Sequence, residues 1–116
     1  MATRITVNNY VSMNKGITPA EGLPIFNDII TAFNAGDSVV LDFQGIDMMT
    51  TAFLNVVIGG LYQNYNTDQL VNMLSFEHIT DATAVRIKTV TDNAKLFYRN
   101  QDKFGQSIEE VLHGGH

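Results

Sequence analysis

The side chains best suited to chemistry follow segments with the pattern of buried strands. Asp42 lies near the end of the apolar run Ser38–Phe43, Asp47 follows in the next connection, and His78 ends the run Leu74–His78. Carboxylates in such places suit Mg²⁺. Together the three residues would fit a small-ligand-binding or enzymatic domain, if the fold brings them into one pocket. In the alternative interpretation, Asp42 accepts hydrogen bonds from a turn and Asp47 is solvated.

Other residue types that serve catalysis or metal binding lack a matching arrangement. The chain has no Cys, which excludes a thiol nucleophile and a zinc–thiolate site. His113 and His116 flank two glycines at the end of the chain, with no indication of converging ligands. The four serines lack the motif of a nucleophile elbow. We therefore predict a non-enzymatic protein with no catalytic residue, no metal and no cofactor.

The middle of the chain carries no basic side chain. Between Gly16 and Val85 there is no Lys or Arg, whereas eight acids lie there, and the whole chain has a formal net charge of -5. Without cations to meet phosphates, a nucleic-acid module and a polybasic membrane patch are both excluded there. The longest apolar stretch, Ala52–Tyr62, is too short to span a bilayer, and MATRITVNNY has no secretory pattern. We expect a cytoplasmic protein.

Strand and helix patterns alternate along the sequence. Strands are predicted over Thr3–Val11 at a sheet edge, over Ser38–Phe43 covered on both faces, and over Leu74–His78. Helices are predicted from Thr18 or Pro24 to Gly36, from Thr50 or Thr51 to about Tyr65, over one turn at Asp68–Met73, from Thr80 or Asp81 to near Asn100, and over Gln106–Leu112.

This order predicts an α/β fold. The sequence β-α-β-α-β-α implies one compact domain over residues 1–112, with a partly parallel sheet and helices packed on it. Residues 113–116 are expected to form a disordered tail. In such folds the functional surface gathers where strand ends meet helix starts, which here is the segment Phe43–Thr51.

The helix after Thr50 has an uncharged outward face. Its core face is predicted to hold six large apolar residues: Phe53, Leu54, Val57, Ile58, Leu61 and Tyr65. The opposite face carries small or uncharged side chains: Ala52, Asn55, Val56, Gly59 and Gln63. Solvated helix faces normally carry charge, so this face favours docking against another protein or a second copy. Alternatively, another helix of the same domain covers it.

Thr50 and Thr51 begin this helix. One of them is expected to cap it. A helix start also offers free N–H groups and a positive dipole end to a phosphate, so either threonine is a candidate phosphoacceptor.

The segment VVLDFQGIDMMTTAFLNVVIGGLY resembles STAS-like domains of unknown function, relatives of the bacterial STAS anti-sigma factor antagonists. The resemblance lies in the strand Val39–Phe43, then Ile46, the hydroxyl pair Thr50-Thr51, and the apolar helix Phe53–Leu61. It covers about 25 residues locally, and the element order extends it over most of the chain.

The resemblance implies a regulatory protein-interaction module. In those antagonists a Ser or Thr at the start of this helix is phosphorylated by a histidine-kinase-like ATPase. The usual acceptor position falls on Ala52, which leaves adjacent Thr51 as the substitute. The implied partner-binding surface is the Gly45–Thr51 loop, with Ile46 and Asp47, and the outward face of the following helix. The acidic surroundings favour a partner with a basic patch.

Overall fold

A computed structural model describes the backbone of residues 1–112 and the side chains of residues 1–98. Its main sheet has three strands, β1 (Ala2–Thr6), β3 (Ser38–Asp42) and β5 (Leu74–Glu77), in the order β1-β3-β5. All three run parallel, with Ala2 beside Ser38 and Val39 beside Leu74. The predicted α/β class and the edge position of the first strand are confirmed.

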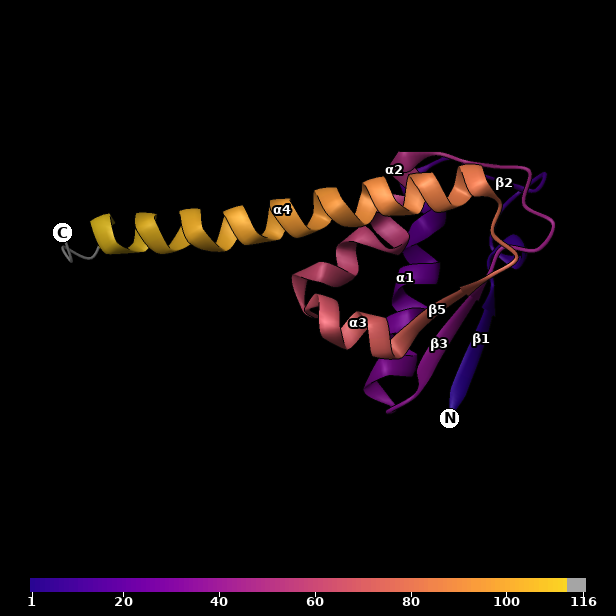
Figure 1. Ribbon diagram of the computed structural model, residues 1–116, viewed down its shortest axis with the longest axis horizontal. Coiled ribbons are helices and arrows are strands. Elements are labelled where there is room, and N and C mark those ends of the chain that lie inside the picture. Colours follow the sequence, from indigo (N-terminus) through magenta and orange to yellow (C-terminus); the bar gives the residue numbers. More distant parts are fainter. Residues whose placement is uncertain (113–116) are drawn as a thin grey trace.

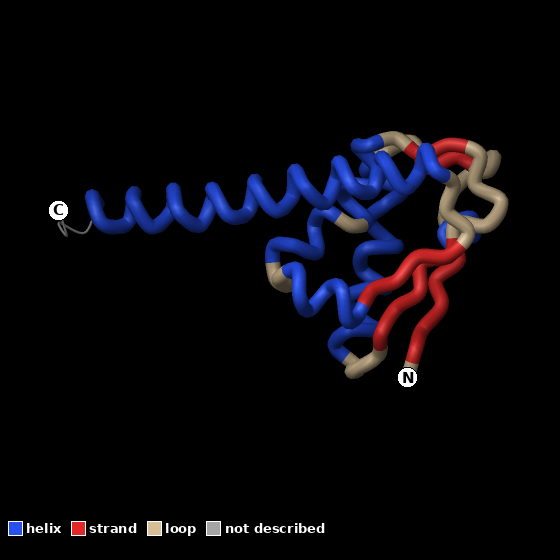
Figure 2. Tube along the Cα trace, viewed as in Figure 1, coloured by secondary structure: helices blue, strands red, loops and turns tan. Residues whose placement is uncertain are grey.

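The helices gather on one side of this sheet (Figures 1 and 2). The core-facing side chains Ile5, Val39 and Leu41 are therefore buried, whereas Val40 on the other face is only half-buried and Arg4 beside it is exposed. The prediction that the central strand is covered on both faces was wrong. At the carboxyl ends of the strands, the open face carries polar residues rather than another apolar layer.

The first segment ends in a short helix, not in a longer strand. A 3₁₀ helix, η1 (Val7–Asn9), follows β1 where the strand was expected to continue to Val11. A second parallel pair then joins β2 (Lys15–Gly16) to β4 (Met48–Met49). This small sheet holds the connection after β3 against the segment before α1.

Helix α1 (Pro19–Asn34) begins at the predicted capping box. The Thr18 side chain accepts a hydrogen bond from the Glu21 N–H, and the Glu21 side chain accepts one from the Thr18 N–H. The helix continues through Pro24, so the alternative start at that residue was wrong. It stops before Gly36, whose φ of 84° suits the left-handed position that glycine adopts most readily after a helix.

The predicted helix after Thr50 is divided in two. Helix α2 (Thr51–Val57) gives way to the 3₁₀ helix η2 (Gly59–Gln63), so one continuous helix to Tyr65 was wrong. The two glycines allow close packing on opposite sides. A Cβ on Gly59 would lie 3.5 Å from Val90, and one on Gly60 would lie 3.1 Å from the Phe26 ring.

The remaining elements complete the core. Helix α3 (Thr67–Met73) has its own capping box from Asn66 and precedes β5. Helix α4 (Asp81–Leu112) is a single helix, so a stop near Asn100 and a separate helix over 106–112 were both wrong. Its end extends well beyond the rest of the domain (Figure 1). The expected tail, 113–116, lies outside the described residues.

The core lies between the sheet and helices α1, α2 and α4. Its fully buried side chains come mainly from β3, α1 and α2, and they include Ile25, Ile29, Val39, Leu41, Phe53, Leu54, Val57, Ile58, Leu61 and Val90. Among the described residues, no helix is long and apolar enough to cross a membrane.

Candidate functional site

A cluster of charged side chains lies where the three main strands end. Arg4, Asp42 and Glu77 share the open face of the sheet, because register pairs Arg4 with Val40 and Asp42 with Glu77. One guanidinium nitrogen of Arg4 lies 2.9 Å from Oδ2 of Asp42 and 2.8 Å from Oε1 of Glu77. A single cation therefore bridges two carboxylates from neighbouring strands.

His78 completes the cluster from the residue after β5. Its Nδ1 lies 2.7 Å from Oδ1 of Asp42, and its side chain is about half exposed. The residue adopts a φ of 56°, a left-handed conformation that non-glycine residues seldom take. This turn of the backbone follows directly after Glu77 and brings the imidazole back to the neighbouring strand.

The electrostatics of Asp42 follow from these contacts. The carboxylate is buried and accepts a hydrogen bond from the Gln44 N–H at 3.0 Å. That N–H, followed by His78, lowers the pKa of Asp42 below its usual value, although burial acts in the opposite direction. The hydrogen bond to Glu77 is the main cause that raises the pKa of Arg4. The contacts therefore favour the ionised forms of Asp42 and Arg4.

The cluster has the donor set of a metal site. Ligand atoms of Asp42, Glu77 and His78 lie within 4.8 Å of one another. The Arg4 guanidinium, however, already forms ion pairs with both carboxylates at hydrogen-bond distance. A metal ion would have to displace that contact. The arrangement instead ties together three strand ends.

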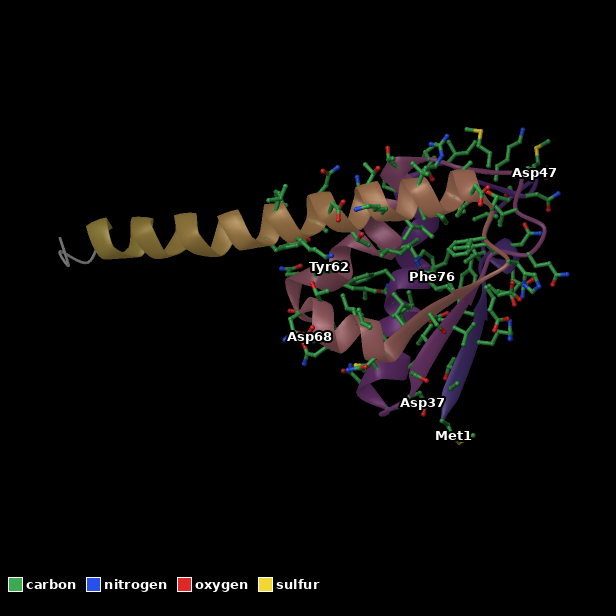
Figure 3. The ribbon with its side chains drawn as sticks, viewed as in Figure 1. Met1, Asp37, Asp47, Tyr62, Asp68 and Phe76 are labelled. Carbon is green, nitrogen blue, oxygen red and sulfur yellow. The ribbon has the colours of Figure 1, made fainter. Side chains whose placement is uncertain are left out.

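Asp47 does not join this cluster. It is exposed in the connection before β4, and its N–H donates to the Asn14 carbonyl at 2.8 Å. Within the described residues, no hydrogen bond or ion pair joins Asp47 to Asp42 or His78. Of the three predicted ligands, the structure brings only two together. Figure 3 shows Asp47 at the end of the molecule beyond the strands.

The connection around Asp47 has a more apolar surface. Three large apolar side chains are exposed on or beside the β2–β4 pair: Met13, Ile17 and Met48, with exposed fractions of 82%, 43% and 46%. Ile46 is half-buried and Met49 is buried, so they fix the connection to the core. The segment predicted as a binding loop therefore presents apolar groups to solvent while remaining anchored.

The outward face of α2 is only partly open. Ala52, Asn55 and Gln63 are exposed and Val56 is half-buried. Gly59 is buried against Val90 and Ala94 of α4, so its placement in a partner-binding surface was wrong. At that position the alternative holds, and a helix of the same domain covers the face.

Thr50 and Thr51 have different environments. The Thr50 hydroxyl caps α2 by accepting from the Phe53 N–H at 3.1 Å, and it donates to the Ile17 carbonyl at 2.7 Å. Thr51 is exposed on the first turn. The structure therefore gives Thr50 the capping role, while Thr51 has the accessible hydroxyl.

Sequence reasoning named Asp42 and His78 but missed Arg4 and Glu77. The missing signal was the strand order. Once β1, β3 and β5 are adjacent and parallel, Arg4 and Glu77 flank Asp42 on one face.

The sequence model for a STAS-like domain of unknown function (DUF4325) matches residues 21–84, more than half of the chain. The match includes β3, the following connection, α2, α3 and β5. Neither a curated protein nor a solved structure matches the chain.

Proposed function

The chain belongs to the family of STAS-like domains of unknown function, and on this basis we propose that it is a non-enzymatic regulatory module that binds another protein. The binding surface is the Gly45–Thr51 connection together with the adjoining residues Met13, Ile17 and Ala52. We call this the loop surface.

The observation that carries the proposal is the exposed apolar group on the loop surface. Met13, Ile17 and Met48 are large, apolar and exposed. The nearby charged side chains Lys15 and Asp47 are exposed as well. Protein interfaces commonly combine an apolar centre with a polar rim. Backbone pairing of β2 with β4 holds the group in place without a partner, which lowers the entropy cost of binding.

The partner class follows from the family resemblance to anti-sigma factor antagonists. We propose a histidine-kinase-like ATPase with a basic contact patch. Residues 16–85 carry eight acids and no Lys or Arg, which favours a partner with a basic patch, because complementary charge accelerates association. Thr51 is the proposed acceptor if the partner transfers phosphate, because the Thr50 hydroxyl already makes two hydrogen bonds.

Binding of a purified histidine-kinase-like ATPase from the same source tests the loop surface. Met48→Glu places a charge at its centre and is expected to weaken binding by about tenfold or more, as interface-centre changes do. Val71→Glu is the matched control, because Val71 is also an exposed apolar residue but lies on α3. Calorimetric titration measures both, and intact mass after addition of ATP detects phosphate on Thr51.

Equal affinity of wild type and Met48→Glu would contradict the loop surface. Equal weakening by Val71→Glu would also contradict it, since a general effect of added charge would then explain the loss.

A further inference from the structure

Strand β1 forms one edge of the main sheet, and no described strand pairs with its outer side (Figure 1). The Met1 carbonyl accepts a hydrogen bond from the Ser38 N–H. Because backbone groups alternate in direction along a strand, the N–H and C=O groups of Ala2, Arg4 and Thr6 point away from β3. We call these three residues the free edge. Such an edge is a template to which an extended chain can add as a further strand.

The free edge lacks the features that usually block strand addition. Folded proteins protect an open edge with Pro or Lys, with a bulge, or with a covering helix or loop. Strand β1 contains neither Pro nor Lys, and its register with β3 runs without a bulge from Ala2–Ser38 to Thr6–Asp42. Its single charge, on Arg4, is already engaged by two carboxylates of the sheet. The edge is therefore available to a partner.

A hollow of about 350 Å³ lies beside this edge, between β1 and α1. Strand β1 lines it with residues 3–5, and Tyr10 lines it beyond the strand. Helix α1 contributes one row of residues with helical spacing: Asp28, Thr31, Ala32 and Ala35. The two alanines are small, so the row leaves space for a side chain that an added strand would direct toward α1.

Two carboxylates, Asp28 and Asp37, line the hollow. Asp28 accepts a hydrogen bond from the Tyr10 hydroxyl, which is a neutral donor, and within residues 1–98 no basic group forms an ion pair with it. Asp37 accepts from the Thr3 hydroxyl at 3.0 Å and lies 3.8 Å from the terminal amino group. The guanidinium of Arg4, which also lines the hollow, is held by the strand-end cluster. The hollow therefore favours a positively charged side chain.

We propose that the free edge binds an extended segment of a partner protein as a fourth strand, with a Lys or Arg side chain of that segment in the hollow. Backbone hydrogen bonds to the free edge supply affinity, and the hollow supplies selectivity. The aliphatic stem of the basic residue packs on Ala32 and Ala35, and its charged group meets Asp28.

A second copy of β1 fits this edge less well. An antiparallel pairing along the whole strand would place Arg4 opposite Arg4 of the other copy, and like charges in that position are destabilising. None of the residues that line the hollow belongs to the loop surface. The inference is therefore independent of the proposed function.

Selection from a displayed library of random peptides of about 12 residues tests the edge, with the full-length chain as the target. Selected peptides are expected to combine β-branched residues with a Lys or Arg, and fluorescence anisotropy measures the affinity of a synthesised one. Asp28→Asn is expected to weaken its binding by about 5- to 10-fold, because it removes the charge and keeps an acceptor for Tyr10. Asp68→Asn is the matched control, since Asp68 is an exposed carboxylate on α3.

Thr6→Pro tests the addition of a strand. The φ of Thr6 is -87°, which suits proline, and the substitution removes an outward N–H without breaking a bond to β3. It is expected to weaken peptide binding by about tenfold or more while the unfolding temperature is retained. Met48→Glu, on the loop surface, is expected to leave the peptide affinity unchanged.

A library that yields no binder, or binders without a basic residue, would overturn the proposal. Unchanged affinity in either Asp28→Asn or Thr6→Pro would overturn it as well. A dimer of the free chain that Thr6→Pro abolishes would overturn the partner segment and assign the edge to a second copy.

Discussion

Asp42 is the residue on which the strand ends converge. Its carboxylate accepts hydrogen bonds from the backbone N–H two residues later and from Arg4 on β1. It also lies against His78, the residue after β5. A buried carboxylate is stable only when its charge is met in this way. The described side chains include no buried polar nitrogen or oxygen without a partner.

Asp42→Asn is therefore expected to lower stability in a pH-dependent way. Because the folded-state pKa of Asp42 lies below its unfolded value, its contribution is fully present above the unfolded pKa and is lost as pH falls through the folded one. The variant should lose more unfolding free energy at about pH 6 than at about pH 3. Urea unfolding at both pH values measures the difference.

Asp47→Asn serves as the control for that measurement, since Asp47 is exposed and outside the cluster. A pH-independent loss in Asp42→Asn would show that the ionised carboxylate does not stabilise the strand ends.

The site could be predicted from the sequence only where one segment defined it. Asp42 was identifiable because it ends the most apolar strand, and Thr50 because it precedes a helical pattern. Arg4 and Glu77 were not identifiable, because their contacts depend on the order of the strands and on the pairing of residues 35 or 36 positions apart in the chain. Such pairing is set by tertiary packing rather than by local pattern.

At the scale of elements, α2 depends strongly on its N-cap residue, Thr50. The helix has seven residues, too few to be stable from propensity alone. Thr50 both caps it and links it to Ile17, the residue after β2. The cap therefore connects the loop surface to the core helix.

Thr50→Val is expected to lower the free energy of unfolding by about 1–2 kcal/mol, because it removes the cap and leaves the Ile17 carbonyl without its donor. Thr50→Ser should retain most of the stability. Thr51→Val should change it by less than about 0.5 kcal/mol, as an exposed first-turn residue. Thermal and urea unfolding check the series, and equal effects at both threonines would contradict the assignment of the cap.

Local signals predicted element types better than element ends. The capping box at Thr18 and the glycine after α1 specify backbone conformations directly. The break between α2 and η2 was missed because apolar spacing continues across it, although Gly59 and Gly60 marked the place. The full length of α4 was missed because Asn100 and Gly105, which lie where the helix was expected to stop, are poor helix formers.

At the scale of the whole molecule, the parallel sheet has a consequence for how the chain folds. Paired residues on neighbouring strands of the main sheet lie 35 or 36 positions apart in sequence, since Val39 pairs with Leu74 and Ala2 with Ser38. During synthesis, β1 therefore emerges with nothing to pair with until β3 follows α1 out of the ribosome. The central strand is the first that can nucleate the sheet, and the last, β5, closes it. A chain whose pairings are all so distant folds more slowly than a helical bundle of equal size.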